Sequence, residues 1–208
     1  AVAGKEIDGV GGSIAQYAIG ITNADADYGF SDKWDIVDLP VYPRRASYLQ
    51  LQKSTAYQGA IPDRVAGTFE RLLYVLSDDK PLLQGTKTSI AELHKTKKPL
   101  PYTDGQVSIS ELIGFAPSGR EAFQRYAADF APILKKYGGT AWLSVRAEMP
   151  IVCEKLWDHW TLVTLPSMDA MKTMFQSDEW QKANENRMAA TERRLSVLSK
   201  PVKIPVPS

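Results

Sequence analysis

The sequence predicts an α+β protein made of two copies of one small unit. Two observations predict this fold class: an ordered series of residues occurs twice along the chain, and the second occurrence carries the strand and helix pattern of a complete unit. At 208 residues, with 44% hydrophobic and 24% charged residues, the chain has the length and composition of one large or two small globular domains.

The repeat is clearest around two tryptophans. The segment WDIVDLP, which begins at Trp34, corresponds to the segment WTLVTLP, which begins at Trp160, at an offset of 126 residues (160 − 34). Further along the chain the offset becomes 123 (180 − 57), so this comparison places three additional residues in the first copy. Other matches follow in the same order, namely Gly11-Gly12 with Gly138-Gly139, Tyr57-Gln58 with Trp180-Gln181, Arg64 with Arg187 and Arg71 with Arg194. Such a series indicates an internal duplication.

The second copy has the pattern of a complete unit. Strands rich in apolar and β-branched residues are predicted at residues 107–115, 140–148, 157–165 and about 195–199. Amphipathic helices are predicted at about 118–137 and 168–191, between the first and second strands and between the third and fourth. The order βαββαβ is that of a ferredoxin-like sheet with helices on one face.

Capping and breaking residues set the expected helix ends. The first helix is predicted to begin at Ser118-x-x-Glu121, which has the pattern of a capping box, and to kink or end at Pro132. Gly138-Gly139 should end it by adopting the left-handed conformation of a helix C-terminus. A break in the second helix is expected near Ser177.

The first copy departs from this pattern. Its Gly-Gly pair lies at residues 11 and 12, which leaves no room for a preceding strand and helix. Either the chain lacks its beginning, or the first copy is a reduced unit completed from elsewhere. We expect a reduced N-terminal ferredoxin-like unit at residues 1–80, a linker at 81–106 and a complete unit at 107–208. A short helix beginning at Ser89 in the linker would help to cover the gap.

The second half resembles the DUF1330 family. The residues that carry the resemblance are Tyr126, Pro132, Lys136-Tyr137-Gly138-Gly139, Trp157, Trp160, Leu165-Pro166-Ser167, Ser177-Asp178-Glu179-Trp180 and Arg187. That family belongs to the dimeric α+β barrel superfamily, so the resemblance implies two ferredoxin-like sheets paired into a barrel, with a ligand pocket between them. Two copies in one chain would make this pair internally, as a pseudo-dimer; a homo-oligomer is the other arrangement. The superfamily includes cofactor-independent monooxygenases, haem-degrading enzymes, muconolactone isomerases and polyketide cyclases, and the fold does not choose among them.

Side chains alternate along a strand, so the repeat assigns them to two faces of the sheet. The residues predicted to pack under the helices are Val37, Leu39, Leu143, Val145 and Ala147. The opposite, open face would line the pocket, and its candidate ligand-binding residues are Trp34, Trp142, Asp158, Trp160 and Thr164. Arg146 and Asp38 fall on the same open face as candidate catalytic residues.

Two functions remain open for this face. In the first, the protein is a small-molecule enzyme without a bound redox cofactor, of the monooxygenase, isomerase or cyclase type. Arg146 would orient an anionic or carbonyl oxygen, Asp38 or His159 would move a proton, and the tryptophans would hold an apolar or aromatic ring. In the second, the protein is a non-catalytic binding or assembly protein whose tryptophans pack an interface.

Structural alternatives exist for the candidate catalytic residues. Arg146 could instead form a cross-strand ion pair with Asp158 or Glu148. His159 alternates to the helix side of its strand, where it would be a hydrogen-bonded structural residue unless a bulge turns it inward. His94 is expected to be solvated in the linker, and Arg187, like Arg64, to be exposed or to cap its helix.

Charge, hydropathy and residue spacing exclude other classes of protein. The 25 Lys and Arg residues nearly balance the 24 Asp and Glu residues, so no overall field favours nucleic acid or an anionic membrane. No apolar run approaches the ~18 residues of a membrane span, and no signal peptide is recognisable, so we expect a cytoplasmic protein. Zinc-type spacings and phosphate-binding glycine loops do not occur in the sequence, and we therefore expect no bound metal or cofactor.

Overall fold

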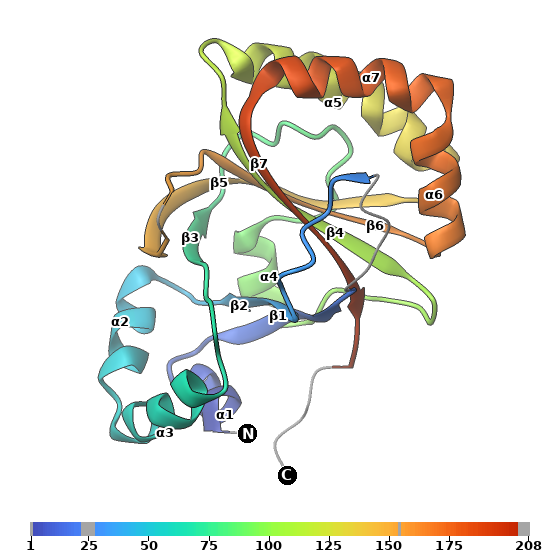
Figure 1. Ribbon diagram of the computed structural model, residues 1–208. Helices are drawn as coiled ribbons and strands as arrows, with labels where there is room; N and C mark the ends of the chain where they lie inside the picture. Colours follow the sequence, from blue (N-terminus) through green and yellow to red (C-terminus); the bar gives the residue numbers. More distant parts are fainter. Residues whose placement is uncertain (1, 22–27, 154, 204–208) are drawn as a thin grey trace.

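The computed structural model describes residues 2–21, 28–153 and 155–203. Its strands form one antiparallel seven-stranded sheet that curls round a concave face, in the order β2-β1-β7-β4-β6-β5-β3 (Figure 1). The strands are β1 (Ser13–Gly20), β2 (Ile36–Val41), β3 (Leu73–Ser77), β4 (Val107–Phe115), β5 (Thr140–Val152), β6 (His159–Leu165) and β7 (Thr191–Pro201). The helices are α1 (Val2–Gly9), α2 (Arg45–Lys53), α3 (Thr55–Ala66), α4 (Ile90–Thr96), α5 (Gly119–Lys136), α6 (Met168–Gln176) and α7 (Asp178–Ala190). The predicted α+β class is confirmed.

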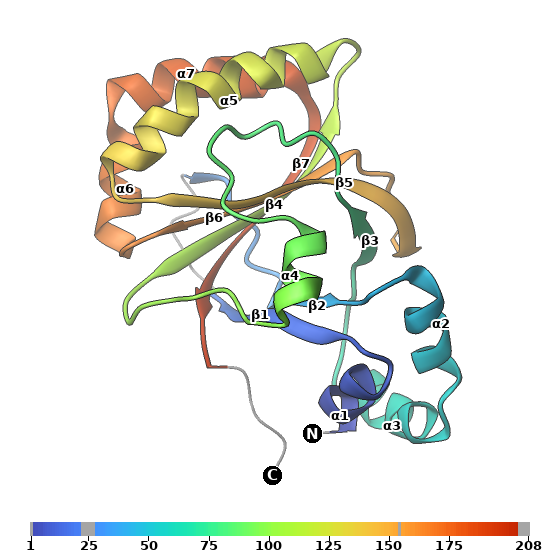
Figure 2. The same cartoon turned by 180° about the vertical axis from the view of Figure 1, so that it is seen from behind.

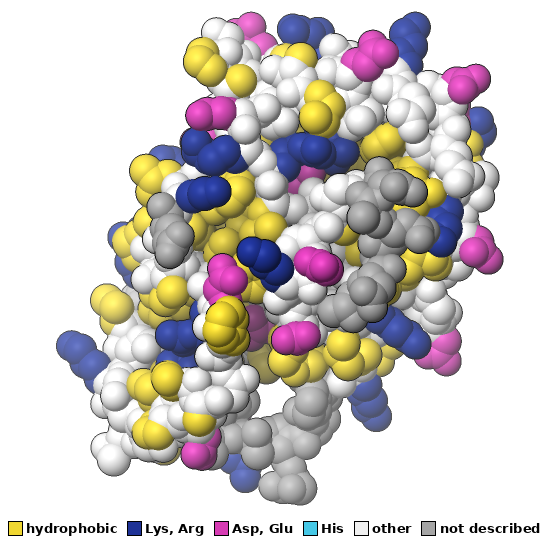
Figure 3. Space-filling view, viewed as in Figure 1, with side chains coloured by type: hydrophobic (Ala, Val, Ile, Leu, Met, Phe, Trp, Pro, Cys, Tyr) yellow, Lys and Arg dark blue, Asp and Glu magenta, His cyan; other side chains and the backbone are white. Residues whose placement is uncertain are grey.

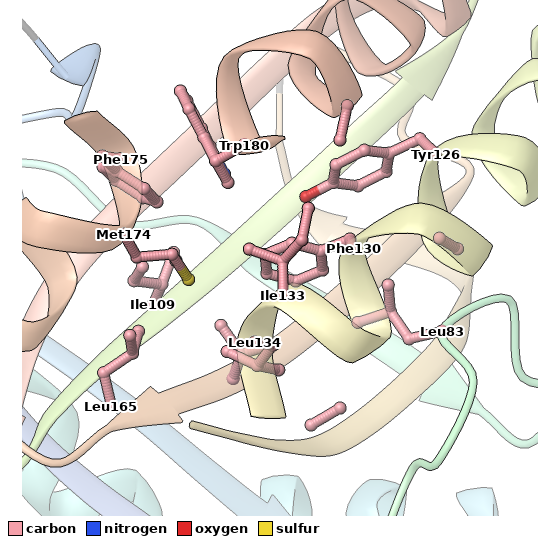
Figure 4. Packing of buried hydrophobic residues seen from close by; sticks show 14 of the residues in the cluster. Leu83, Ile109, Tyr126, Phe130, Ile133, Leu134, Leu165, Met174, Phe175 and Trp180 are labelled. Atoms are coloured by element: carbon pink, nitrogen blue, oxygen red, sulfur yellow. The ribbon is translucent and has the colours of Figure 1, made fainter. Parts of the chain in front are cut away.

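The second half forms a complete ferredoxin-like unit, as predicted. Its elements follow the order β4-α5-β5-β6-α6-α7-β7, and its strands lie in the order β7-β4-β6-β5. Helices α5, α6 and α7 cover one face of the sheet (Figures 1 and 2). The core between them includes Ile109 and Leu165 from the sheet and Phe130 and Met174 from the helices (Figure 4). Burial of each such side chain contributes roughly 1.5–3 kcal/mol, so this layer is a main source of stability.

The two halves of the chain join at both ends of this unit. Strand β1 pairs with β7, with Gly20 opposite Ser199, and strand β3 pairs with β5, with Leu76 opposite Ala147. The first half contributes β1, β2 and β3 in the positions that β5, β6 and β7 hold in the second. The sheet pairing of a dimeric α+β barrel is thus made within one chain, and β2 and β3 are the two edge strands.

The strand registers show how the two halves correspond. Gln16 pairs with Leu39 in the first half, and Leu143 pairs with Leu162 in the second. The offset is therefore 127 residues for β1 (143 − 16) and 123 residues for β2 (162 − 39). A register shift precedes both Gln16 and Leu143, so the same bulge occurs in both halves.

The predicted offset of 126 residues for this strand is wrong. With the observed offset, Trp34 corresponds to Trp157 rather than to Trp160, and each lies two residues before its strand. The predicted offset is three residues too large. Because successive side chains of a strand face opposite sides, an error of an odd number of residues assigns every side chain to the wrong face. Leu39, which was expected under the helices, therefore packs on the concave side in a cluster with Trp160 and Leu162.

The helix end predicted at Gly138-Gly139 is confirmed, and the same end occurs at Gly11-Gly12, where no preceding helix was expected from the sequence. Gly11 and Gly138 have φ angles of +80° and +73°, a left-handed conformation that favours glycine. The amide of the following glycine donates to a carbonyl in the last helical turn, over 2.9 Å in the first half and 2.8 Å in the second. The short helix α1 therefore holds the position of the end of α5.

The Ser118 signal acts differently from the prediction, Pro132 does not end its helix, and the break at Ser177 is confirmed. Ser118 has a φ of +59° and makes no capping hydrogen bond through its side chain. The first helical residue is glycine because a Cβ there would lie only 2.0 Å from the Ala190 carbonyl oxygen. Pro132 lies inside α5, which continues to its end at Lys136 because Pro132 is exposed and the turn that loses a hydrogen bond faces solvent. The break at Ser177 is confirmed, since its hydroxyl accepts from the Trp180 amide at the start of α7.

The linker helix α4 lies on the concave side of the sheet (Figure 2). Ser89 begins it as predicted, its hydroxyl accepting a 3.1 Å hydrogen bond from the Glu92 amide. Leu93 is buried and packs in the concave cluster with Leu112 of β4, so the helix fills part of the space that the curled sheet encloses. Within the described ranges, no helix has the length and hydropathy required to cross a membrane.

We expect Gly138→Ala to lower the free energy of unfolding by about 1–2 kcal/mol, because a left-handed conformation is strained in any residue with a Cβ. Urea denaturation at neutral pH measures the change. Gly59→Ala is the matched control: Gly59 lies inside α3 with open space where its Cβ would be, so the substitution should stabilise the helix by roughly 0.5–1 kcal/mol. Equal effects of the two substitutions would contradict the assigned role of Gly138.

Candidate functional site

A cavity of about 710 Å³ opens between β2 and β3. Every residue of both strands lines it, from Ile36 to Val41 and from Leu73 to Ser77. Because alternate residues of a strand face opposite sides, a cavity that touches all of them runs along the edges of the strands. Figure 3 shows this side of the molecule, where apolar side chains gather at the centre with basic and acidic side chains around them.

Two further walls complete the cavity. The wall on the concave side is formed by Ser110 and Leu112 of β4, Trp160 of β6, Leu195 and Val197 of β7, and Ile90 and His94 of α4. The wall on the opposite side is formed at the start of α2, by Tyr42, Pro43, Arg44, Arg45 and Tyr48. The concave wall is mostly apolar, whereas the α2 wall carries phenol and guanidinium groups.

Three polar atoms at this cavity are buried without a hydrogen-bond partner among the described residues. They are Nε1 of Trp34, Nδ1 of His94 and Oγ of Ser110. An unsatisfied buried donor or acceptor costs about 1–3 kcal/mol. Such groups in folded proteins normally have partners, which include water and ligands. These three are among seven such atoms in the described residues, and they belong to side chains that line this cavity, where water or a bound molecule is the available partner.

Asp38 lines the cavity from the α2 side. Its carboxyl group is open to the cavity but surrounded by protein, and this burial raises its pKa against the lowering effect of a hydrogen bond from its own backbone amide. Tyr42 lies nearby, with its ring 5.6 Å from that of Tyr48, and burial also raises the pKa of its hydroxyl. A carboxyl group with a raised pKa is a better proton acceptor than an ordinary aspartate.

The structure brings three of the predicted site residues together and separates others. Trp34, Asp38 and Trp160 line the cavity. Trp142 and Thr164 line a different cavity of about 220 Å³, where Nε1 of Trp142 donates to Oγ1 of Thr164 over 2.9 Å.

Asp158 also lies away from the cavity. It is exposed beside the end of β4, and its carboxylate accepts a 2.8 Å hydrogen bond from the Phe115 amide. Its observed contact is therefore with the backbone of a neighbouring strand.

The expectation that Arg146 faces the pocket is wrong. The bulge at Trp142 adds one residue to β5 opposite β6, and it reverses the alternation beyond that point. Val145 and Ala147, which were expected under the helices, pack in the concave cluster instead. Arg146 is exposed on the opposite face, paired in register with His159. Sequence alternation alone could not place it, because a bulge leaves no clear signal in the residue types.

His159 lies on the helix side of its strand, the structural alternative expected for it. It is fully buried between Phe115 and Phe123, and its Nε2 lies 2.8 Å from Oγ of Ser144. That hydroxyl accepts from the amides of Leu82 and Leu83, so its only proton is directed to Nε2, which leaves the ring hydrogen on Nδ1. Burial lowers the pKa of His159 to about 4.

Arg187 was expected to be exposed or to cap its helix, but it is buried. Its Nη1 donates to Oε1 of Glu111 over 3.0 Å, and the Ser196 hydroxyl donates to the same oxygen over 2.8 Å. The guanidinium also lies over the rings of Tyr126 and Trp180. A glutamate in the middle of an apolar strand was the signal for such a partner, since a buried carboxylate requires a cation nearby.

His94 and Ser110 are site residues that the sequence-based prediction missed. His94 lies four residues after Ile90 on α4 and next to the buried Leu93, so helical periodicity places it on the inward face. Ser110 lies two residues before Leu112 in β4, so both side chains are on the concave face. Within the part of the chain that the structure describes, no three His, Cys, Asp or Glu side chains group closely enough to hold a metal ion.

The curled sheet with two pseudo-symmetric halves defines an α+β barrel protein built from ferredoxin-like units, with a cavity where the sheet remains open. Residues 115–201 match the family described as "Domain of unknown function (DUF1330)", which confirms the resemblance for that segment. A comparison with curated proteins finds no match.

Solved structures extend the likeness. RPA0582, a protein of unknown function from Rhodopseudomonas palustris, is 24% identical, with 49% of this chain and 86% of that chain covered and a TM-score of 0.45. A dimeric protein with a ferredoxin-like fold from Bacteroides fragilis is 14% identical, covers 47% of this chain and 97% of its own, and has a TM-score of 0.35. An anthrone oxidase-like protein is 10% identical, with 97% of this chain and 86% of that chain covered and a TM-score of 0.60. This last likeness shows the fold of the chain over both halves.

We expect acid to destabilise the protein through His159. Between its ordinary pKa of about 6.5 and its folded pKa of about 4, the unfolded chain binds a proton that the folded protein does not, so stability falls as the pH drops through this range. The loss should reach roughly 3 kcal/mol below pH 4. Urea denaturation at several pH values measures it. His159→Gln, which keeps a hydrogen-bonding group but cannot titrate, should show a shallower decline; an unchanged slope would contradict this account.

Proposed function

We propose that this protein binds an apolar or aromatic small molecule in the cavity between β2 and β3. We further propose that it acts on this molecule as an enzyme without a bound redox cofactor, of the monooxygenase, isomerase or cyclase type. The cavity carries the proposal, with its volume of about 710 Å³, its aromatic and apolar lining and its three buried polar atoms without partners among the described residues. Small-molecule sites typically combine about 300–1,000 Å³ of mostly apolar space with a few orienting polar groups.

The concave wall suggests a role for each of its polar residues. Trp34 and Trp160 supply flat surface for a ring, and the Ser110 hydroxyl and the Trp34 Nε1–H can hydrogen-bond a carbonyl oxygen. The three reaction types all need a proton to be moved next to a carbonyl or phenol. We assign that step to His94, because its Nδ1 is buried at this wall without a described partner. Asp38, with its raised pKa, is the alternative acceptor from the α2 side.

A polycyclic aromatic ketone is a suitable first substrate to test. The name of the anthrone oxidase-like neighbour is compatible with such a molecule, although the likeness to it concerns the fold. In the oxidation of anthrone, one oxygen atom of dioxygen enters the product anthraquinone and the other leaves as water, while the substrate supplies the electrons. The overall reaction therefore balances with dioxygen as the only added oxidant.

A non-catalytic binding or assembly function is the second candidate. One observation favours it: the cavity runs along two strand edges, and such edges readily pair with another segment. Turnover of a bound molecule would distinguish an enzyme from a binding protein.

We expect Trp34→Phe to weaken binding of anthrone by about fivefold, because it removes part of the aromatic surface and one hydrogen-bond donor, together worth about 1 kcal/mol. Titration followed by quenching of tryptophan fluorescence measures the dissociation constant. Trp142→Phe is the matched control, since Trp142 lines the other cavity and its Nε1–H is bonded to Thr164. Equal weakening by both substitutions, or no saturable binding to the unmodified protein, would exclude this site for the ligand.

We expect His94→Gln to reduce oxygen uptake with anthrone by about 100-fold, the lower range for loss of a general base, while anthrone binding changes little. An oxygen electrode and the absorbance of anthraquinone follow the reaction. Lys95→Gln, on the exposed side of the same helix, is the control. Saturable binding without turnover by the unmodified protein would favour the non-catalytic function.

A further inference from the structure

The complete second half shows what the gap between β2 and β3 lacks. In that half β4 lies between β6 and β7, antiparallel to both. Strands β2 and β3 hold the positions of β6 and β7, since Ser77 lies opposite Arg146 as Lys200 lies opposite Ile19, an offset of 123 (200 − 77). The described residues place no strand between β2 and β3, so each has one paired side and one side facing the cavity.

The two halves differ in the volume at this position. In the second half a cavity of about 30 Å³ remains beneath the helices, lined by Thr161 of β6 and Ser196 of β7. The corresponding residues of the first half, Asp38 and Leu73, line the cavity of about 710 Å³. Strand β4 and helix α5 fill the space in the second half. The larger cavity therefore includes the volume of a strand.

Arg64 provides an independent observation. It corresponds to Arg187 (187 − 64 = 123), and each guanidinium lies over an aromatic ring on its own helix, Tyr57 at 5.3 Å for Arg64 and Trp180 at 5.5 Å for Arg187. Arg187 pairs with Glu111 of β4. Nη1 of Arg64 donates to the Tyr57 hydroxyl, and its buried Nε has no described partner because Ile61 stands where Asn184 bonds Nε of Arg187. The correspondence of Arg64 with Arg187 places the counterpart of Glu111 on the absent strand.

A second arginine adds positive charge at the same place. Arg71 corresponds to Arg194 (194 − 71 = 123), whose Nη1 lies 3.7 Å from Glu111. Burial raises the pKa of Tyr48, while the charges of Arg64 and Arg71 lower it, so both guanidinium groups act on this side of the cavity. Asp38 is the carboxylate that β2 itself supplies there. The counterpart of Glu111 would add a carboxylate beside these two arginines.

Helix α3 is less covered than its counterpart. Helix α7 buries four residues against the sheet and α5, whereas α3 buries none in the described structure. Val65 at the end of α3 is 56% exposed and the following Phe69 is fully exposed. Helix α7 packs against a strand and a long helix, α5, whereas α3 has no such strand in the described structure and, apart from the adjoining α2, packs against α1, which holds the position of the end of α5.

We propose that the gap between β2 and β3 receives one further β-strand from a partner polypeptide, antiparallel to both neighbours, mostly apolar, with a central carboxylate that pairs with Arg64. This chain's own segment Val107–Phe115 has that chemistry, with Glu111 at its centre. The inference does not rest on the proposed function, because it is argued from β2, β3 and Arg64, whereas the ligand is argued from Trp34, Trp160 and His94; both occupants are assigned to the same cavity.

A synthetic peptide tests the proposal. The probe has the sequence of residues 107–115, VSISELIGF, with two lysines at each end for solubility and a fluorescent label. We expect saturable binding by fluorescence anisotropy and slower amide hydrogen exchange in β2 and β3 on peptide addition. Replacing the peptide's glutamate by glutamine should weaken binding about tenfold, as loss of a charge-assisted hydrogen bond does. Arg64→Met should remove this tenfold difference, whereas the exposed control Arg125→Met should keep it.

A covalent variant gives a second measurement that does not depend on peptide solubility. Helix α1 corresponds to residues 129–136 at the offset of 127, so a copy of residues 107–128 joined directly before Val2 would supply the strand and the missing part of the helix. We expect its melting temperature to rise by roughly 5 °C or more. Equal binding of a scrambled peptide, absence of protection in β2 and β3, or an unchanged melting temperature would overturn the proposal. Anthrone binding is measured separately on the unmodified protein without peptide, so failure of either proposal can be recognised independently.

Discussion

Backbone pairing between the two halves is the constraint on which the rest of this structure depends. Strands β5 and β7 are the longest of the sheet, and each pairs with its own unit over one part and with the first half over another. The first half has no described strand between β2 and β3, so its two pieces are joined through the sheet of the second half. The arrangement of the N-terminal half therefore depends on strand pairing with the complete second half.

That arrangement leaves several polar groups of the first half without described partners. In the second half, a buried carboxylate, two arginines and a serine hydroxyl satisfy one another beneath the helices, as buried charges must. The first half repeats the helix, the arginine and its aromatic partner, but it does not supply the strand that would carry the carboxylate. The same gap gives the cavity its opening, so the candidate ligand site and the incomplete strand order have one structural origin.

The candidate site was predicted only in part, and the errors have definite causes. Trp34, Asp38 and Trp160 were expected at a pocket and line one, although Asp38 lies on the α2 side and Trp160 on the concave side. The prediction that Arg146 faces the pocket was wrong because one bulged residue reverses the facing of all later side chains of the strand. Matching Trp34 with Trp160 was wrong by three residues, and this error also assigns side chains to the wrong face. The sequence offered the correct match, Trp34-Asp35 with Trp157-Asp158, which gives the observed offset.

The sequence by itself determined the duplication, the order of elements in the second half and the glycine helix ends, because these depend on local residue patterns and backbone conformation. Only the tertiary structure decided which strands lie side by side and which face of each strand meets the cavity. Those outcomes depend on hydrogen bonds between residues far apart in the chain and on bulges that change register. No pattern within a single segment specifies either.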